Sequence, residues 1–204
     1  MFGKVASDVL GLSDVGSVIR PEDYDKVEAD DYVMHEEDEK IFFLIKSKAD
    51  EYCFTNKALI HVDGENAVSK KRMLRRYSYR DHKITNVELE TAGTVDLDIE
   101  IKFVMGEVPF SIDVNKKFID QLKDLYKALL KIDEITHENE ALMGYAQQSL
   151  QLASTTLSRS ENQDSHLYEE FNEINQASFN WLSEAKEKYH VKDFGFVFER
   201  FINN

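Results

Sequence analysis

The sequence predicts an α+β protein, in which a strongly bent antiparallel sheet of seven strands is closed by one amphipathic helix and followed by a helical hairpin. Three observations support this fold class. Residues 95–103 alternate strictly between apolar and charged side chains, the period of a strand with one face on a core and one in water. After Asn115, which is a good helix N-cap residue, the apolar period changes to three and four, which is typical of a helix. Residues 140–157 are rich in Ala, Leu and Gln, with Gly144 as their one helix breaker.

The composition is that of a globular protein with room for two small domains. The chain has 204 residues, of which 42% are hydrophobic and 31% charged, with only 8 Gly and 2 Pro. The net charge of -14 would repel a nucleic-acid duplex, so we expect no nucleic-acid partner. Cys53 is the only cysteine, which excludes an intramolecular disulfide and fits a reducing compartment. The amino terminus lacks the apolar core of a signal peptide, so a cytoplasmic location is predicted.

The first 39 residues are predicted to form an arm that precedes the sheet. Residues 1–18 are weakly amphipathic and fit a short helix or a loosely held segment. Pro21 followed by acidic residues predicts a short helix at about residues 22–29, because acids in the first turn favour the positive end of the helix dipole. The acidic stretch at residues 30–39 lacks the spacing and the glycine of a calcium loop, so we expect a solvated loop.

Seven strands are predicted between residues 40 and 115. They are residues 41–45, 51–55, 58–62, 70–80, 83–91, 95–103 and 108–114. Asn56 and Lys57 form a tight connection between the second and third strands, and residues 91–94 form the turn before the alternating strand. Pro109 cannot donate to a central ladder, but it is tolerated near the start of the last strand or on an edge strand. The apolar face of the helix that follows can close the open end of the sheet.

Three segments of this region resemble a known family. They are Phe-Thr-Asn-Lys at residues 54–57, Tyr-Ser-Tyr-Arg-Asp-His at residues 77–82 and Glu-Thr-Ala-Gly-Thr at residues 90–94. In this order, over residues 40–130, the chain resembles the bacterial pleckstrin-homology (PH) domain family typified by YvbH-like proteins. The resemblance implies a bent seven-stranded sheet capped by a C-terminal helix, with no catalytic residues and no assigned ligand pocket. From residue 131 onward the chain resembles the helical extension of YvbH-like proteins, which implies a role in oligomerisation.

The extension is predicted to be an antiparallel helical hairpin. Its first helix ends near residue 157, residues 158–164 form a polar turn, and residues 167–189 present the apolar face of a second helix. Residues 191–202 are rich in aromatic side chains and fit either a short strand or a last helix. The predicted organisation is an arm at residues 1–39, a PH-like domain at 40–130 and a helical extension at 131–204.

The sequence carries none of the motifs on which an enzyme prediction could rest. The six histidines are scattered, and no two have the i, i+4 spacing of a helical metal pair. There is no nucleophile elbow, phosphate-binding glycine loop or dinucleotide fingerprint. Cys53 lies within a predicted strand, where a small buried hydrophobe is its expected role. We therefore expect a non-catalytic protein that uses no cofactor and no metal.

Carboxylates of the fifth and sixth strands form one candidate interaction surface, the acidic face. Its residues are Glu88, Glu90, Asp96, Asp98 and Glu100. Paired carboxylates can perform acid–base chemistry, but no apolar residues surround these carboxylates to raise a pKa. The favoured interpretation is therefore that they form the solvent-exposed side of a half-buried sheet. Like charges on neighbouring strands repel, so we expect a cationic partner.

The candidate for that partner is the basic cluster that precedes it. Its residues are Lys70, Lys71, Arg72, Arg75 and Arg76. Three interpretations stay open: a solvated strand edge that discourages aggregation, a head-to-tail contact with the acidic face of a neighbouring subunit that could close a ring, or a contact with anionic lipid headgroups. The net charge counts against the lipid interpretation, and strand alternation would divide the cluster between two faces.

Aromatic residues of the extension are the candidate assembly contacts. They are Phe171, Trp181, Phe194 and Phe198. A two-helix unit cannot easily cover them alone, so the extension is expected either to pack on other copies or to fold back on its own domain. The predicted function is an interaction and assembly module that forms a homo-oligomer and has an unidentified protein partner. The alternative is peripheral binding of anionic membrane lipid, or of a peptide ligand, by the PH-like domain.

Overall fold

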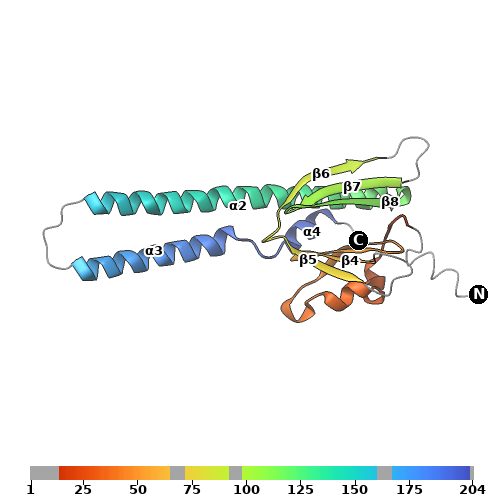
Figure 1. The fold of residues 1–204 in the computed structure, drawn as a ribbon, viewed down its shortest axis with the longest axis horizontal. Coiled ribbons are helices and arrows are strands. Elements are labelled where there is room, and N and C mark those ends of the chain that lie inside the picture. The colour runs from red at the N-terminus through yellow and green to blue at the C-terminus, as the bar shows by residue number, and fades with distance from the viewer. Residues whose placement is uncertain (1–13, 65–71, 92–97, 160–166, 203–204) are drawn as a thin grey trace, which may run out of the picture. The chain divides into compact units, whose positions relative to one another are not determined.

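The computed structural model describes residues 14–64, 72–91, 98–159 and 167–202, which form two compact units (Figure 1). The first unit combines Met1–Asp133 with Lys192–Asn204, and the second is Glu134–Val191. The last segment of the chain therefore packs with the sheets, whereas the sequence analysis assigned it to the extension. In sequence, the second unit is inserted between two parts of the first.

The first sheet has five antiparallel strands in the order β1-β2-β3-β4-β5. Their bounds are Ser17–Val18 (β1), Ile41–Lys46 (β2), Glu51–Thr55 (β3), Ala58–Asp63 (β4) and Met73–Ser78 (β5). Strands β2 to β5 confirm the first four predicted strands. The short strand β1 pairs with the end of β2. It was not predicted, because a strand of two residues is too short to show an alternation of apolar and polar side chains.

The second sheet has three antiparallel strands in the order β6-β7-β8. Their bounds are Ile84–Glu90 (β6), Asp98–Met105 (β7) and Val108–Asn115 (β8). They confirm the last three predicted strands within the described residues, whereas residues 92–97, which include most of the predicted turn and the start of the sixth predicted strand, lie outside them. Pro109 lies near the start of β8, at the end of the strand order. Gly16 joins the two sheets, because its amide donates to the Asp113 carbonyl and its carbonyl accepts from Asn115. A Cβ at Gly16 would lie 2.7 Å from Ile45 Cγ2, so only glycine fits there.

The central strands of the first sheet, β2 to β4, are buried on both faces. On its inner face the Phe54 ring lies edge-on to Phe103, which stacks on Phe110 of β8. The outer face is covered by the N-terminal segment, whose buried side chains pack against Cys53 and its neighbours. The apolar residues of this second core are Ile19, Val27, Ala29, Val33, Leu44, Cys53, Ile60 and Val62. Burial on both faces explains why the sequence of β2 is a continuous apolar run rather than an alternation of apolar and polar residues.

The structure of the segment that covers the outer face differs from two predictions. The predicted helix at residues 22–29 is wrong: the chain forms short 3-10 helices, Pro21–Lys26 (η1), Glu28–Tyr32 (η2) and His35–Glu37 (η3). The interruption is at Val27, whose backbone is extended while its side chain enters the core. The acidic loop is also not fully solvated, because Glu39 at its end is 1% exposed.

A long helix links the two units. After a 3-10 turn at Lys116–Phe118 (η4), helix α2 spans Ile119–Arg159 without a break. The Asn115 side chain accepts a hydrogen bond from the Lys117 amide, which confirms the expected cap. In the first unit α2 buries Leu122, Leu125, Ala128, Leu129 and Ile132. Leu130, next to the buried Leu129, is exposed.

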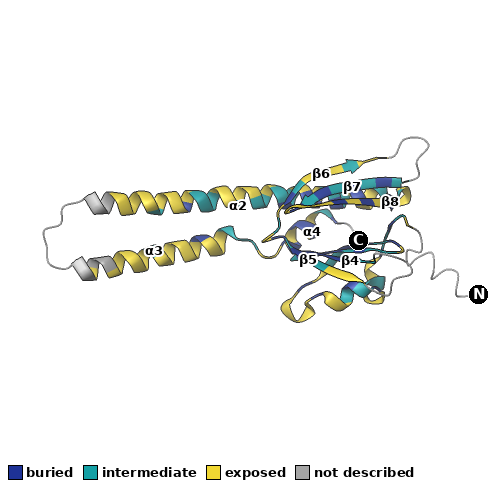
Figure 2. Ribbon diagram, viewed as in Figure 1, coloured by how far each residue is buried: buried dark blue, intermediate teal, exposed yellow. Residues whose placement is uncertain are grey.

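Helix α3 spans Leu167–Tyr189, and within the second unit it lies beside the distal part of α2, which confirms the helical hairpin (Figure 1). Both helices are coloured mainly as exposed there (Figure 2). No helix in the described ranges combines the length and the apolar character needed to cross a membrane.

The chain ends in helix α4, Gly195–Phe201, which answers the open question between strand and helix. The Phe198 ring stacks on Phe42 at a centroid distance of 5.4 Å, and Phe194 meets Tyr79 edge-on at 5.8 Å. Asn56, in the β3–β4 turn, fixes the entry to α4: its carbonyl accepts from the Phe194 amide, and its side-chain amide donates to Asp193 at 2.6 Å. The same side chain also binds backbone groups of Asp38 and Lys40.

Candidate interaction surfaces

The described members of the basic cluster lie on and beside β5, and each pairs with a carboxylate of its own chain. Arg72 Nε lies 3.1 Å from Glu28 Oε2, and Arg75 Nη1 lies 2.6 Å from Asp63 Oδ2. Arg76 Nη2 lies 2.9 Å from Glu39 Oε1. These arginines therefore do not form an uncompensated cationic patch. Lys70 and Lys71 lie outside the described residues.

Glu39 is the centre of a buried polar network. Its carboxylate accepts hydrogen bonds from the Thr55 hydroxyl, the Met34 amide and the Arg76 guanidinium. Burial alone would raise the pKa of Glu39, but the hydrogen bonds and the charge of Arg76 outweigh it, so the pKa lies below its usual range. The network ties the N-terminal segment to β3 and β5. In the sequence, Glu39 could not be distinguished from its exposed acidic neighbours.

The acidic face is partly neutralised by a lysine of its own strand. In the sheet register Glu90 lies opposite Glu100, and Glu100 lies opposite Asp113. Lys102 Nζ lies 2.8 Å from Glu90 Oε2 and 2.7 Å from Glu100 Oε2. The cationic partner that the repulsion requires is thus present within the sheet. The alternation of β7 offered a signal for it, because Lys102 is the next outward position after Glu100.

Other members of this face differ in their surroundings. Glu88 is exposed opposite Lys102, and Asp98 lies opposite Asn115. Burial, followed by the nearby charges of Glu100 and Asp98, raises the pKa of Asp113. Asp96 lies outside the described residues. In the described ranges, no group of three or more His, Cys, Asp or Glu has a metal-binding arrangement.

An aromatic cleft of about 420 Å³ opens between the inner face of the first sheet and the start of β8. The Tyr52 and His61 rings stack with centroids 4.5 Å apart, and the Phe110 ring stands edge-on to both and to Tyr77. Arg75 and Ser111 add polar groups to its wall. A cleft of this size and lining can hold an amino-acid side chain or a small ligand. Sequence reasoning missed it, because its walls come from four separate strands.

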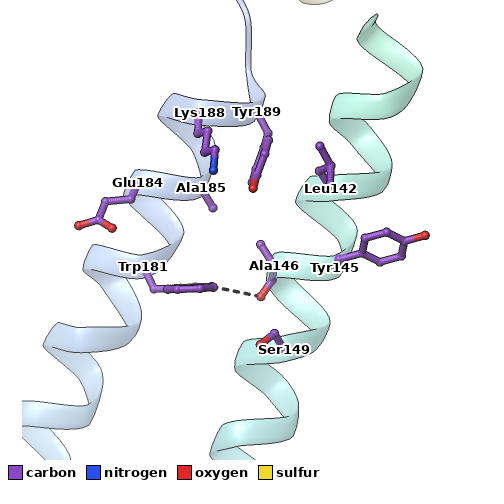
Figure 3. Close-up of a pocket in the computed structure, with 9 residues that line it drawn as sticks. All are labelled: Leu142, Tyr145, Ala146, Ser149, Trp181, Glu184, Ala185, Lys188 and Tyr189. Carbon is purple, nitrogen blue, oxygen red and sulfur yellow. Dashed lines mark hydrogen bonds between the residues drawn. The ribbon is translucent and has the colours of Figure 1, made fainter. Parts of the chain in front are cut away.

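The helical hairpin of the second unit has almost no interior of its own. Ala146 of α2 and Ala185 of α3 are the only buried residues among the described part of residues 134–191. The Trp181 indole Nε1 donates to the Ala146 carbonyl oxygen at 3.4 Å, although the Trp181 side chain is half exposed (Figure 3). Further large apolar side chains on the hairpin surface are Tyr145, Leu152, Ile174, Phe179 and Leu182.

A hollow of about 340 Å³ lies in the seam between the two helices (Figure 3). Its lining residues are Leu142, Tyr145, Ala146, Ser149, Trp181, Glu184, Ala185, Lys188 and Tyr189. In the close-up, Trp181 and Ala185 point from α3 toward α2, whereas the Tyr145 ring points away from α3. The small side chains of Ala146 and Ala185 allow α2 and α3 to approach each other, but they do not fill the hollow.

The four candidate assembly residues of the extension have different positions. Trp181 lies on the hairpin, as expected, and the side chain of Phe171 in α3 lies outside the described set. Phe194 and Phe198 are fully buried in the first unit, so they are not available to a neighbouring subunit. Sequence reasoning missed Tyr145, Leu152 and Phe179. In the sequence, the signal for these three residues was an apolar side chain that lies off the apolar face of its own helix.

Comparison with known proteins agrees with this architecture. The model of the family described as bacterial PH domain matches residues 9–132, and that of the YvbH-like oligomerisation region matches residues 144–204. Over all 204 residues the chain is 58% identical to the full length of "Uncharacterized protein YvbH" from Bacillus subtilis (strain 168). It also matches the crystal structure of a PH domain containing bacterial protein from Exiguobacterium sibiricum 255-15. That match has a TM-score of 0.88 and 51% identity, over 93% of this chain and 100% of the other.

Proposed function

This chain belongs to the bacterial PH domain family and carries a YvbH-like oligomerisation region, and on that basis we propose that it is a non-catalytic assembly protein that forms homo-oligomers through its helical hairpin. The observation that carries the proposal is the contrast between the two units. The first unit has two apolar cores, whereas the described part of the second buries only two alanines and exposes several aromatic rings. Exposed apolar surface of this kind marks an interaction site.

Physical reasoning supports a helical partner for the hairpin. Two antiparallel helices cannot enclose a core, and bundles become stable when further helices cover the exposed stripes. A second copy of the same hairpin supplies surface of matching chemistry. The lipid alternative has less support, because the described arginines of the basic cluster are paired with carboxylates of the same chain.

The experiment that tests the proposal removes the hairpin but keeps α4. A chain cut after Leu130 would also lose Phe194 and Phe198, which would uncover Tyr79 and Phe42 and confuse loss of assembly with unfolding. Residues 134–191 should instead be replaced by a flexible Gly/Ser linker. Light scattering coupled to size-exclusion chromatography should then give an oligomeric mass for the full chain and the mass of one chain for the variant.

The control for this variant is the state of its first unit. Circular dichroism with a strand signature and an unreactive Cys53 thiol would show that this unit is folded, since Cys53 is fully buried. The same number of subunits in the full chain and in a folded variant would disprove assembly through the hairpin.

A further inference from the structure

We propose that the outer edge of β8, together with the aromatic cleft beside it, binds an extended segment of another protein and holds an arginine or lysine side chain of that segment in the cleft. The site belongs to the first unit and is independent of the proposed assembly through the hairpin. Three features meet there: a free strand edge, aromatic walls and a surplus of carboxylates.

Gly16 shows that the outer edge of β8 can pair with a second strand segment. Its amide donates to the Asp113 carbonyl at 2.8 Å, and its carbonyl accepts from the Asn115 amide at 3.0 Å. In an extended strand the backbone groups of every second residue point to the same side, so those of Ser111 and Pro109 also point away from β7. Within the described part of the chain, the Ser111 amide forms no hydrogen bond. The edge is therefore paired at one end and free at the other.

The free part of this edge can form a ladder with an added strand. The Ser111 amide and carbonyl and the Pro109 carbonyl are the groups available to it, since proline has no N–H. Ser111 and Pro109 also line the aromatic cleft of about 420 Å³, together with Tyr52, His61 and Arg75. Side chains of neighbouring strands that share a face lie side by side, so alternate side chains of the added strand point toward the cleft. The cleft has room for one long side chain.

The charges around the cleft favour a cationic side chain. Among the described residues that line it, Arg75 alone carries a fixed charge, and its Nη1 lies 2.6 Å from Asp63 Oδ2. Burial, followed by the charges of Asp50, Asp63 and Asp113, raises the pKa of Tyr52. A cation gains from this surplus of carboxylates, whereas a phosphate or carboxylate is repelled. The formal charge of -14 on the whole chain adds a long-range attraction for a basic partner, which a second copy does not provide.

The walls of the cleft suit an organic cation. The Tyr52 and His61 rings stack with centroids 4.5 Å apart, and Tyr77 and Phe110 add two further rings. A guanidinium or ammonium group over an aromatic face is attracted by the ring, and the apolar stem of arginine or lysine packs against such walls. The free strand edge then selects a peptide over a small amine, because only a peptide can use both the edge and the cleft.

A peptide library tests the chemistry of the occupant on the full-length chain. Each pool of short, fluorescein-labelled peptides has one fixed central residue, flanked by random Thr, Val and Gln to favour an extended backbone. Fluorescence anisotropy should show binding of the Arg and Lys pools, and at least about tenfold weaker binding of the Leu, Asp and Glu pools. No binding of the Arg and Lys pools, or equal binding of the Asp and Glu pools, would overturn the proposal.

Ser111→Pro tests the strand edge, and Ser111→Ala is its matched control. Both variants lose the Ser111 hydroxyl, which donates to Glu100, but only proline also removes the backbone amide. Pro109 occupies the equivalent position two residues earlier on the same edge, so β8 should tolerate a second proline there. We expect Ser111→Pro to weaken binding of the Arg pool about tenfold and Ser111→Ala to keep it.

Asp113→Asn tests the charge beside the edge. Its matched control is Asp31→Asn, which removes the same charge from an exposed residue of η2, on the outer side of the first sheet. At low salt, Asp113→Asn should weaken binding of the Arg pool about fivefold, and Asp31→Asn should leave it unchanged.

An unreactive Cys53 thiol shows that the first unit is folded in each variant. Equal binding by Ser111→Pro and Ser111→Ala, or by the two asparagine variants, would reject the site. If Ser111→Pro does not fold, the comparison of Asp113→Asn with Asp31→Asn still decides. A smaller oligomeric mass for Ser111→Pro than for Ser111→Ala would assign the edge to a contact between copies, and it would equally overturn the proposal.

Discussion

Single residues decide how the N-terminal segment is held on the first sheet, and Glu39 is the main one. It is a carboxylate without solvent contact that receives hydrogen bonds from Thr55, Met34 and Arg76. A buried charge is tolerated only when its partners replace the lost water. Glu39 therefore holds the N-terminal segment in position on the first sheet.

The lowered pKa of Glu39 predicts an acid sensitivity. Because the folded-state pKa lies below the usual 4.5, the ionised group stabilises the fold above that pH, and this contribution is lost as the pH falls through the folded-state value. Glu39→Gln should lower the free energy of unfolding at pH 7 by about 1–3 kcal/mol. Between pH 7 and pH 4, urea titrations should show a smaller loss of stability in Glu39→Gln than in the wild type.

The control is Glu36→Gln, because Glu36 is an exposed carboxylate in the same segment. This variant should follow the wild-type pH dependence. Parallel pH profiles for wild type and Glu39→Gln would contradict a stabilising role for the ionised Glu39.

At the scale of elements, helix α4 packs the end of the chain against the sheets of the first unit. In this sense α4 acts as a latch. Its contacts are specific: Phe198 stacks on Phe42, Phe194 meets Tyr79, and Asn56 holds the entry to the helix. The seven-residue helix is too short to be stable alone, so these contacts hold it in place. The latch should therefore contribute to the stability of the sheets, not only to that of α4.

Truncation of the buried ring of α4 tests this role. Phe198→Ala should destabilise the first unit by about 3–5 kcal/mol, since it opens a cavity beside Phe42 and Tyr79. The labelling rate of the buried Cys53 thiol reports on that unit, because the chain has no other cysteine. The rate should rise at least about a hundredfold, given a factor of ten for each 1.4 kcal/mol. Phe196→Ala, at an exposed position of the same helix, should change it little; equal effects of the two would contradict the latch.

At the scale of the whole molecule, the chain combines a unit with two apolar cores and a unit whose described part buries only Ala146 and Ala185. Both ends of the hairpin are joined in sequence to the first unit, through α2 and through the segment before α4. The aromatic cleft and the acidic face belong to the first unit, and the proposed assembly through the hairpin uses neither of them.

An oligomer held by the hairpin predicts a melting temperature that depends on protein concentration. Subunit association stabilises the folded state by mass action, so the midpoint of thermal unfolding for the full chain should rise with each tenfold increase in concentration. The chain with residues 134–191 replaced by a linker should show a constant midpoint. Differential scanning calorimetry over a hundredfold concentration range measures both, and a constant midpoint for the full chain would argue against assembly at these concentrations.

Most of the fold could be predicted from local sequence patterns. The alternation before Phe103 and the change of period after Asn115 report which side chains of one element share a face, and that information is local. For the same reason the hairpin and the cap at Asn115 were predictable. The helix predicted at residues 22–29 was not found, because the core position of Val27 overrides local helix preference.

The sequence by itself determined the α+β class, the order of the elements and the presence of an aromatic surplus in the extension. Only the tertiary structure decided which aromatics the chain covers itself: Phe198 is buried under its own latch, whereas Phe179 is exposed. It likewise decided that Glu39 is buried and that Lys102 partly neutralises the acidic face. The reason is physical: periodicity sets the face on which a side chain lies, but its burial and its partners depend on which distant surface packs against that face.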